Sequence, residues 1–281
     1  MNSREMDELV DTLVRQVRQR MAGGGPTGDD TTFRFQYASG WNANVTLVSA
    51  QAIHAAGRAD NRVARRIDHT LLKPDATREQ VVQLCEEAKR HNFYSVCINS
   101  SNVALCAELL KGSQTVPICV VGFPLGASLP QVKAFEAKEA IALGAREIDT
   151  VVNIGALKSG DYQAVLEDLA MTVEASAPYP VKVILETSKL NDEEKVAACV
   201  LSRQARAAFV KTSTGFGGGG ATIEDVALMK RVVGGSGMKV KASGGVRTHE
   251  DAWKMIEAGA DRLGASSSVA VVTGGEGKGD Y

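Results

Sequence analysis

The chain has 281 residues, of which 44% are hydrophobic, and this length suits one large domain or two small ones with a core that needs no disulfides. A net charge of −1 argues against a nucleic-acid partner, and no stretch is long and apolar enough to span a membrane. The five cysteines are scattered, odd in number and without CxxC spacing, which predicts buried reduced thiols in a cytoplasmic protein.

The first 22 residues predict an amphipathic helix. Acidic residues lead it and arginines close it, an order that complements the helix dipole. Its acidic start and lack of an apolar segment are not typical of a secretory signal. A narrow apolar stripe either packs on the rest of the chain or meets a partner surface. The stripe consists of Met6, Leu9, Val10, Leu13, Val14, Val17 and Met21.

Residues 23–62 follow as a linker and an irregular extension. Gly23-Gly24-Gly25-Pro26 ends the helical pattern and indicates a flexible linker. The remainder of this segment is mixed in composition and shows no regular periodicity. We therefore expect three parts, 1–22, 23–62 and 63–281, the last ending in a flexible tail rich in glycine.

From about residue 65, short apolar runs alternate with amphipathic segments. The runs predict strands at Arg66–Leu71, Tyr94–Asn99, Ile118–Gly122, Glu147–Asn153, Val181–Glu186, Ala208–Lys211, Met238–Ala242 and Arg262–Gly264. The segments between them predict helices at Thr77–His91, Leu129–Leu143, Asp161–Ala175, Asp192–Gln204, Thr222–Val233 and Thr248–Ala258. Eight strands interleaved with helices match an α/β fold, the (β/α)8 or TIM barrel, here with an N-terminal helical extension.

A doubly wound open sheet is the competing layout. No GxGxxG follows the first predicted strand, which counts against its dinucleotide-binding version. Thr77 and Thr248 are typical capping residues at helix starts, and Gly144 and Gly259 stand where helices are expected to end.

Two lysines close neighbouring predicted strands. Lys211 ends Ala208–Lys211, and Lys241 holds the equivalent position on the next strand, so both amines are expected at the carboxyl ends where barrel enzymes keep their active sites. Adjacent strands lie about 4.8 Å apart, and one ammonium group disfavours a second beside it. The pattern predicts that Lys241 keeps Lys211 partly neutral and nucleophilic, although a lone lysine there would more often extend past the strand end into solvent.

Two aspartates interrupt apolar strands. Asp149 lies within Glu147–Asn153, and an acid that points into a barrel needs a cationic partner. Opposite two lysines it either transfers protons or forms a purely structural salt bridge. Asp68, in the first predicted strand, is expected to bind a substrate hydroxyl or to orient Lys241.

Small residues follow the last three predicted strands. Loops after strands seven and eight commonly bind phosphate in barrel enzymes, through backbone N–H groups at a helix start. Arg247 either assists there or pairs on the rim. The predicted phosphate-binding residues are Gly215, Gly244, Gly245, Ser266 and Ser267.

The remaining reactive side chains indicate no other chemistry. Cys97 has no histidine partner and is interpreted as packing. No carboxylate and histidine cluster has the spacing of a divalent metal site, which disfavours a metal-dependent mechanism.

These segments closely resemble the deoxyribose-phosphate aldolase family. The matching segments span about residues 65 to 270 and include Ile67–Leu72, Ser95–Asn99, Glu147–Asp149, Phe209–Gly217, Lys241–Arg247 and Gly264–Ser267. The resemblance implies a class I aldolase without metal or cofactor that reversibly splits 2-deoxy-D-ribose 5-phosphate into D-glyceraldehyde 3-phosphate and acetaldehyde, in deoxyribose catabolism. It also implies a small-molecule sugar phosphate as partner and a homo-oligomer, a dimer.

The resemblance assigns the roles residue by residue. It makes Lys211 the Schiff-base lysine, Lys241 the lysine that perturbs its pKa, and Asp149 the proton-transferring acid. Some members carry a lysine where this chain has Phe216, a departure that concerns phosphate affinity. Other members end in a tyrosine that reaches the pocket from a mobile tail, which makes Tyr281 a candidate contributor.

The N-terminal arm resembles the encapsulation peptides of bacterial microcompartment enzymes. Such a peptide is a short amphipathic helix followed by a linker, as in residues 1–26. The resemblance implies that residues 1–22 dock on a microcompartment shell protein.

Two other functions stay open from the sequence. One is a different Schiff-base lyase or transaldolase acting on another sugar phosphate. The other is a catalytically silent barrel that serves as a scaffold, against which the intact set of Lys211, Lys241 and Asp149 argues.

Overall fold

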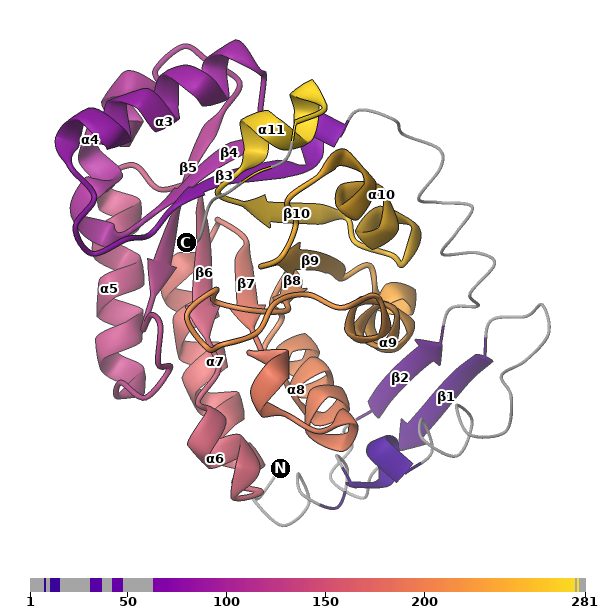
Figure 1. The fold of residues 1–281 in the computed structure, drawn as a ribbon. Coiled ribbons are helices and arrows are strands. Elements are labelled where there is room, and N and C mark those ends of the chain that lie inside the picture. Colours follow the sequence, from indigo (N-terminus) through magenta and orange to yellow (C-terminus); the bar gives the residue numbers. More distant parts are fainter. Residues whose placement is uncertain are drawn as a thin grey trace.

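Eight parallel strands close into a barrel ringed by helices (Figure 1). The computed structural model describes residues 8, 11–15, 63–275 and 277, together with the backbone of 31–36 and 42–47. The strands follow one another around the barrel in chain order, and β10 closes it by pairing with both β3 and β9. This closure confirms the predicted (β/α)8 barrel and excludes the open doubly wound sheet.

All eight barrel strands lie within two residues of the predicted runs. Their apolar and β-branched residues suit strands that are covered on both faces. The strands are β3 (Ile67–Leu71), β4 (Ser95–Ile98), β5 (Val116–Val121), β6 (Glu147–Val151), β7 (Val181–Ile184), β8 (Phe209–Lys211), β9 (Lys239–Ser243) and β10 (Arg262–Ala265).

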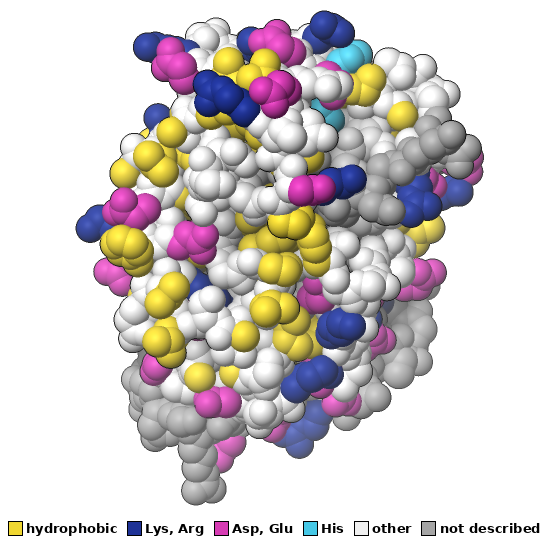
Figure 2. Space-filling model, turned by 60° about the vertical axis from the view of Figure 1, so that its left-hand side comes forward, with side chains coloured by type: hydrophobic (Ala, Val, Ile, Leu, Met, Phe, Trp, Pro, Cys, Tyr) yellow, Lys and Arg dark blue, Asp and Glu magenta, His cyan; other side chains and the backbone are white. Residues whose placement is uncertain are grey.

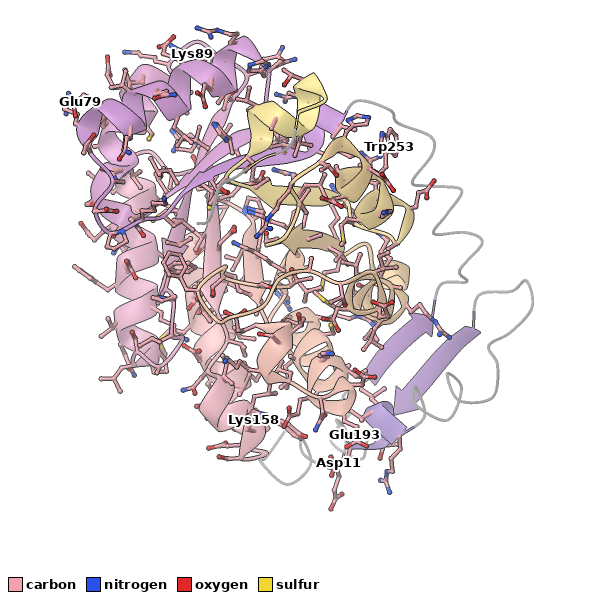
Figure 3. The ribbon with its side chains drawn as sticks, in the orientation of Figure 1. Asp11, Glu79, Lys89, Lys158, Glu193 and Trp253 are labelled. Atoms are coloured by element: carbon pink, nitrogen blue, oxygen red, sulfur yellow. The ribbon has the colours of Figure 1, made fainter. Side chains whose placement is uncertain are left out.

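The six predicted helices form with bounds shifted by no more than one residue. The side chains of Thr77 and Thr248 accept hydrogen bonds from the third helical residue, as their capping role requires. Charged residues such as Glu79 and Lys89 point away from the barrel (Figure 3). The helices are α3 (Arg78–Arg90), α5 (Pro130–Ala142), α7 (Tyr162–Ser176), α8 (Asp192–Gln204), α9 (Ile223–Val233) and α10 (His249–Glu257).

Several short helices were not predicted. Each is shorter than the window over which a 3.6-residue period is recognisable. They are the α-helices α4 (Val103–Leu109), α6 (Ile154–Lys158) and α11 (Ser268–Thr273), and the 3-10 helices η1 (Val63–Arg66), η2 (Ser100–Asn102), η3 (Thr187–Lys189) and η4 (Gly234–Ser236).

The barrel interior is divided between apolar and charged side chains. Ile118 and Val120 on β5 cluster with Leu72 and Cys97, while the alternate residues of β5 join the outer core beneath the helices. The remaining interior is lined by buried ionisable groups of β3, β6, β7, β8, β9 and β10. This charged half of the interior holds the candidate site.

The described part of the N-terminal arm contacts the barrel. Residues 11–15 are helical, and Leu13 and Val14 are buried within the main hydrophobic cluster, with 1% and 8% of their surface exposed. Strands β1 (Thr31–Gln36) and β2 (Asn42–Leu47) form an antiparallel pair that was not predicted, although β-branched residues occur in both. β2 lies against α9 and η4, at the side of the barrel (Figure 1).

Candidate active site

Lys211 and Lys241 are brought together by strand register. Lys211 is the last residue of β8, and its direct partner on β9 is Lys241. Both side chains are buried, with exposures of 2% and 0%. Parallel pairing aligns the carboxyl ends of the strands, so two lysines at equivalent strand positions enter one interior space.

One carboxylate lies between the two amines. Oδ2 of Asp149 on β6 accepts a hydrogen bond from Nζ of Lys211 at 3.0 Å and from Nζ of Lys241 at 2.9 Å. Asp149 is completely buried. The three predicted residues therefore form one contiguous cluster.

The cluster drives the pKa values of the two lysines apart. Burial lowers the pKa of Lys211, and the neighbouring Lys241 ammonium lowers this pKa further. Burial also acts to lower the pKa of Lys241, but the carboxylates of Asp149 and Asp68 outweigh it and hold this pKa well above its ordinary value. Lys211 is consequently the amine that loses its proton more easily.

Asp149 stays ionised despite its burial. Burial alone raises its pKa, but the ammonium groups of Lys182, Lys241 and Lys211 outweigh this and hold the pKa of Asp149 well below the usual range. A carboxylate in this state accepts protons only transiently. It is suited to relaying protons and to orienting the lysines.

Asp68 contacts Lys241, the lysine that it was predicted either to orient or to leave for a substrate hydroxyl. Its Oδ2 lies 2.6 Å from Nζ of Lys241, and its Oδ1 accepts hydrogen bonds from Arg262 and from the Ser95 hydroxyl, both at 2.6 Å. Burial acts to raise the pKa of Asp68, but Arg262, Lys241 and Lys182 together lower it.

Three charged residues of the cluster were missed by the sequence analysis. Nζ of Lys182 lies 2.9 Å from Asp149 and 2.5 Å from Glu147, and Glu147 also pairs with Arg262 at 3.3 Å. Lys182 interrupts the apolar run Val181-Lys182-Val183, the same signal that identified Asp149. Arg262 and Glu147 stand at strand starts, where a charge ordinarily faces solvent.

Hydrogen bonds hold the strand ends that carry the two lysines. The Thr212 hydroxyl donates to the Ser243 carbonyl and accepts from the Ser243 N–H, both at 3.0 Å, and so joins the ends of β8 and β9. Gly264 on β10 leaves room for this arrangement, because a Cβ there would lie 2.3 Å from the Ser243 hydroxyl and 3.1 Å from Cε of Lys241.

A buried glutamate anchors the turn after Lys211. Glu186 adopts left-handed backbone geometry, with φ of 58°, and its carboxylate accepts hydrogen bonds from the N–H and the hydroxyl of Thr214. Gly217 passes so close that a Cβ would lie 2.4 Å from this carboxyl carbon. Glu186 was not predicted, and neither its side-chain contacts nor its backbone geometry is visible in the sequence.

The glycine turns predicted to bind phosphate line one cavity. Its volume is about 400 Å³, and it lies between the loops that follow β8, β9 and β10. Gly215, Gly244, Gly245 and Ser266 line it together with Arg247. Ser267 precedes α11, and the tail at Gly277 lies against it and donates its N–H to the Arg247 carbonyl.

Other residues named from the sequence lie apart from this chemistry. Cys97 is buried inside the barrel, and burial raises the pKa of its thiol. Tyr281 lies outside the described residues.

The described residues offer neither a metal site nor a membrane-spanning helix. Within the described ranges, no three His, Cys, Asp or Glu side chains are grouped so that they could hold a metal ion. Over the same ranges, no helix has both the length and the apolar character needed to cross a membrane.

The fold and the site together define a (β/α)8 enzyme built around a buried lysine cluster. The family profile described as "DeoC/LacD family aldolase" matches residues 62–275. The chain therefore belongs to this family of aldolases.

Similar proteins agree with this assignment. A deoxyribose-phosphate aldolase of Streptococcus suis is 57% identical over 220 residues, which are 78% of this chain and 100% of that protein. The crystal structure of a putative deoxyribose-phosphate aldolase from Coccidioides immitis has a TM-score of 0.78 at 37% identity, covering 95% of this chain and 96% of that one. A tetrameric deoxyribose phosphate aldolase from Aeropyrum pernix has a TM-score of 0.71 at 34% identity, covering 80% and 97%.

Proposed function

We propose that this protein is a class I aldolase that reversibly cleaves 2-deoxy-D-ribose 5-phosphate to D-glyceraldehyde 3-phosphate and acetaldehyde. The observation that carries this function is the buried Lys211 amine, whose pKa is lowered beside Lys241 and which lies 3.0 Å from Asp149. The relatives named deoxyribose-phosphate aldolase support the choice of substrate. The reaction serves the breakdown of deoxyribose phosphates.

The proposed reaction begins at Lys211. Its neutral amine attacks C1 of the open-chain aldehyde, and the resulting carbinolamine loses water to become an iminium ion. The iminium accepts the electron pair of the C2–C3 bond as the C3 hydroxyl loses its proton, which releases C3–C5 as glyceraldehyde 3-phosphate. The enamine left on Lys211 takes up a proton, and hydrolysis of the new iminium releases acetaldehyde and restores the amine.

Asp149 and Lys241 divide the supporting work in this mechanism. Asp149 relays protons between Lys211, the substrate and water, because its carboxylate touches the amine directly. Lys241 remains protonated, held by Asp149 and Asp68, and supplies the positive charge that keeps Lys211 neutral. Asp68 orients Lys241.

The phosphate group is assigned to the cavity beyond the strand ends. Gly215, Gly244, Gly245 and Ser266 line it, and Ser267 precedes α11 beside it. Backbone N–H groups at such turns suit a phosphate dianion, and Arg247 adds a cation. We assign Tyr281 to the same pocket as a contribution from the tail.

Reductive trapping tests the reaction and the nucleophile together. Acetaldehyde and borohydride should add an ethyl group to Lys211, detected by peptide mass spectrometry. Lys211→Ala should abolish both trapping and activity, while Lys189→Ala, an exposed lysine after β7, should retain both. A label on another lysine, or turnover of a different sugar phosphate in preference to deoxyribose 5-phosphate, would reject the proposal.

We also propose that the protein forms a homodimer through the face of α5. Leu129, Val132 and Phe135 are 68%, 51% and 65% exposed, and hydrophobic side chains gather on the face that α5 and its neighbours present (Figure 2). Contiguous apolar surface of this kind marks contact sites. Sedimentation velocity should give a dimer for the native chain and a monomer for Phe135→Glu, and a native monomer would reject the proposal.

For the N-terminal arm, we propose three functional parts and a targeting role. Residues 1–22 dock on a microcompartment shell protein, 23–62 link them to the barrel of 63–281, and the enzyme is otherwise cytoplasmic. The helical pattern and the Gly-Gly-Gly-Pro linker support this. Docking requires release of Leu13 and Val14, which are buried here.

Deletion of residues 1–22 tests targeting. The truncated chain should keep its aldolase activity and lose co-localisation with shell proteins. Unchanged packaging, or a loss of activity equal to the loss of packaging, would count against a targeting role.

A further inference from the structure

A second cavity opens at the opposite end of the barrel from Lys211. Its volume is about 530 Å³, within the range of small-molecule sites. Glu147, Phe209, Lys239 and Arg262, the first residues of β6, β8, β9 and β10, line it. The cavity therefore lies at the amino ends of the strands, and we call it the lower cavity.

Cations dominate the lining of the lower cavity. Arg203, Arg206, Lys239 and Arg262 all contribute to it. The carboxylate of Glu147 does not neutralise the first three, because it is engaged by Lys182 at 2.5 Å and by Arg262 at 3.3 Å. The cavity is left with a net positive charge.

Three of these cations have no anionic partner. Among the residues that the structure describes, the side chains of Arg203 and Arg206 have neither a hydrogen bond nor an ion pair, and the Lys239 ammonium lies over the Phe209 ring, 5.7 Å from its centroid. Arg203 is half-buried, and burial lowers its pKa. Partly desolvating a guanidinium without a counter-charge is unfavourable, so an anion from solution would stabilise this arrangement.

The backbone at Arg206 is a second, independent indication. Arg206 has φ of 62° in the turn after α8, as Asn92 has φ of 54° after α3, whereas the turns after α5 and α10 use Gly144 and Gly259 at positive φ. A residue with a Cβ is disfavoured in the left-handed region, where glycine is not. Strained positions of this kind cluster at ligand sites, and here the strain places an arginine in the lining of the cavity.

We propose that the lower cavity binds a small phosphomonoester, at a site distinct from the phosphate cavity near Lys211. Two arginines and a lysine suit a phosphate dianion, since the planar guanidinium donates two parallel hydrogen bonds to phosphate oxygens. The volume accommodates an attached sugar or nucleoside. An extended nucleic acid or a peptide does not suit a recess of this size at the end of a barrel.

The lower cavity is close to the catalytic cluster. Phe209 and Lys239 are register partners, and Lys211 and Lys241 are the register partners two residues further along the same strands. Two residues span about 7 Å. Ion pairs from Arg262 through Asp68 to Lys241 join the two regions.

Calorimetric titration of the full chain with ribose 5-phosphate and with AMP tests the proposal at physiological ionic strength. Arg206→Gln/Lys239→Gln removes two exposed cations of the cavity and should weaken binding by about tenfold or more. Arg78→Gln, an exposed arginine on α3, and Ser266→Asp, which places a carboxylate in the other cavity, should leave a site of native affinity. Comparing the affinities of the two probes shows whether the lower cavity prefers a sugar phosphate or a nucleotide.

Three results would overturn the proposal. They are the absence of binding of both probes to the native chain, native affinity in the double variant, and an equal loss in Arg78→Gln, which would reflect general charge. The melting temperature of each variant establishes that it is folded. Because the side chains of Arg206 and Lys239 are exposed and make no hydrogen bond to a described residue, the double variant should melt as the native chain does.

Discussion

Lys211 and Lys241 donate hydrogen bonds to the same oxygen of Asp149, at 3.0 and 2.9 Å, from directly paired positions on β8 and β9. The carboxylate holds two amines together that would otherwise repel each other. Among the residues that the structure describes, Lys241 has a second carboxylate, Asp68, and Lys211 does not. This asymmetry decides which lysine gives up its proton.

Replacing Lys241 should therefore move the pH dependence of activity. Without the neighbouring ammonium the pKa of Lys211 rises, so Lys241→Met should shift the acidic limb of kcat/KM to higher pH. Activity at pH 7 should fall about tenfold for each unit by which this pKa rises. Lys241→Arg keeps the positive charge and serves as the control. An unshifted limb in Lys241→Met would show that Lys241 does not set the pKa of Lys211.

Asp149→Asn should separate Schiff-base chemistry from proton transfer. The amide is of similar shape but cannot relay protons as a carboxylate does, so kcat should fall by about 10²–10⁴-fold. Loss of the buried charge among three lysines should also lower the free energy of unfolding by about 3–5 kcal/mol. Steady-state kinetics and urea unfolding measure the two effects. Lys211 should still be trapped slowly by borohydride, and native kcat in the variant would contradict the relay.

The buried aspartates should make the protein sensitive to acid. Asp68 and Asp149 have lowered pKa values when folded, so near pH 4 the unfolded chain binds more protons, and the free energy of unfolding falls as the pH drops. Each such group contributes a slope of up to about 1.4 kcal/mol per pH unit below its unfolded pKa. Urea unfolding between pH 6 and 3 should be less steeply pH-dependent in Asp68→Asn by about this amount. Equal slopes would mean that Asp68 titrates normally.

The turn held by Glu186 should affect substrate binding more than chemistry. Glu186→Ala removes the acceptor of both Thr214 hydrogen bonds and frees the turn that carries Gly215. KM for a phosphorylated substrate should rise about tenfold, with a smaller change in kcat. Glu186→Gln should recover part of the loss, and Gly217→Ala should reproduce it because its Cβ would meet the Glu186 carboxylate. A fall in kcat at constant KM would contradict this positioning role.

Periodicity was sufficient to predict the barrel, whose strands and long helices repeat strongly enough to be recognised. The same reasoning failed for α4, α6 and α11, which have seven, five and six residues. It also failed for the β1 and β2 pair, because a two-stranded pair depends on what it packs against, here α9 and η4.

The sequence by itself determined which residues stand at the carboxyl ends of the strands, because strand length and order place Lys211, Lys241 and the glycine turns there. Only the tertiary structure decided which charges meet. Arg262 and Asp68 pair across 194 positions of the chain, and Lys182 on β7 contacts Asp149 on β6. The reason is physical: barrel closure and strand stagger bring these groups within 3 Å of one another. Because the groups are buried, the charges of their neighbours shift the pKa of each one away from the ordinary value for its residue type.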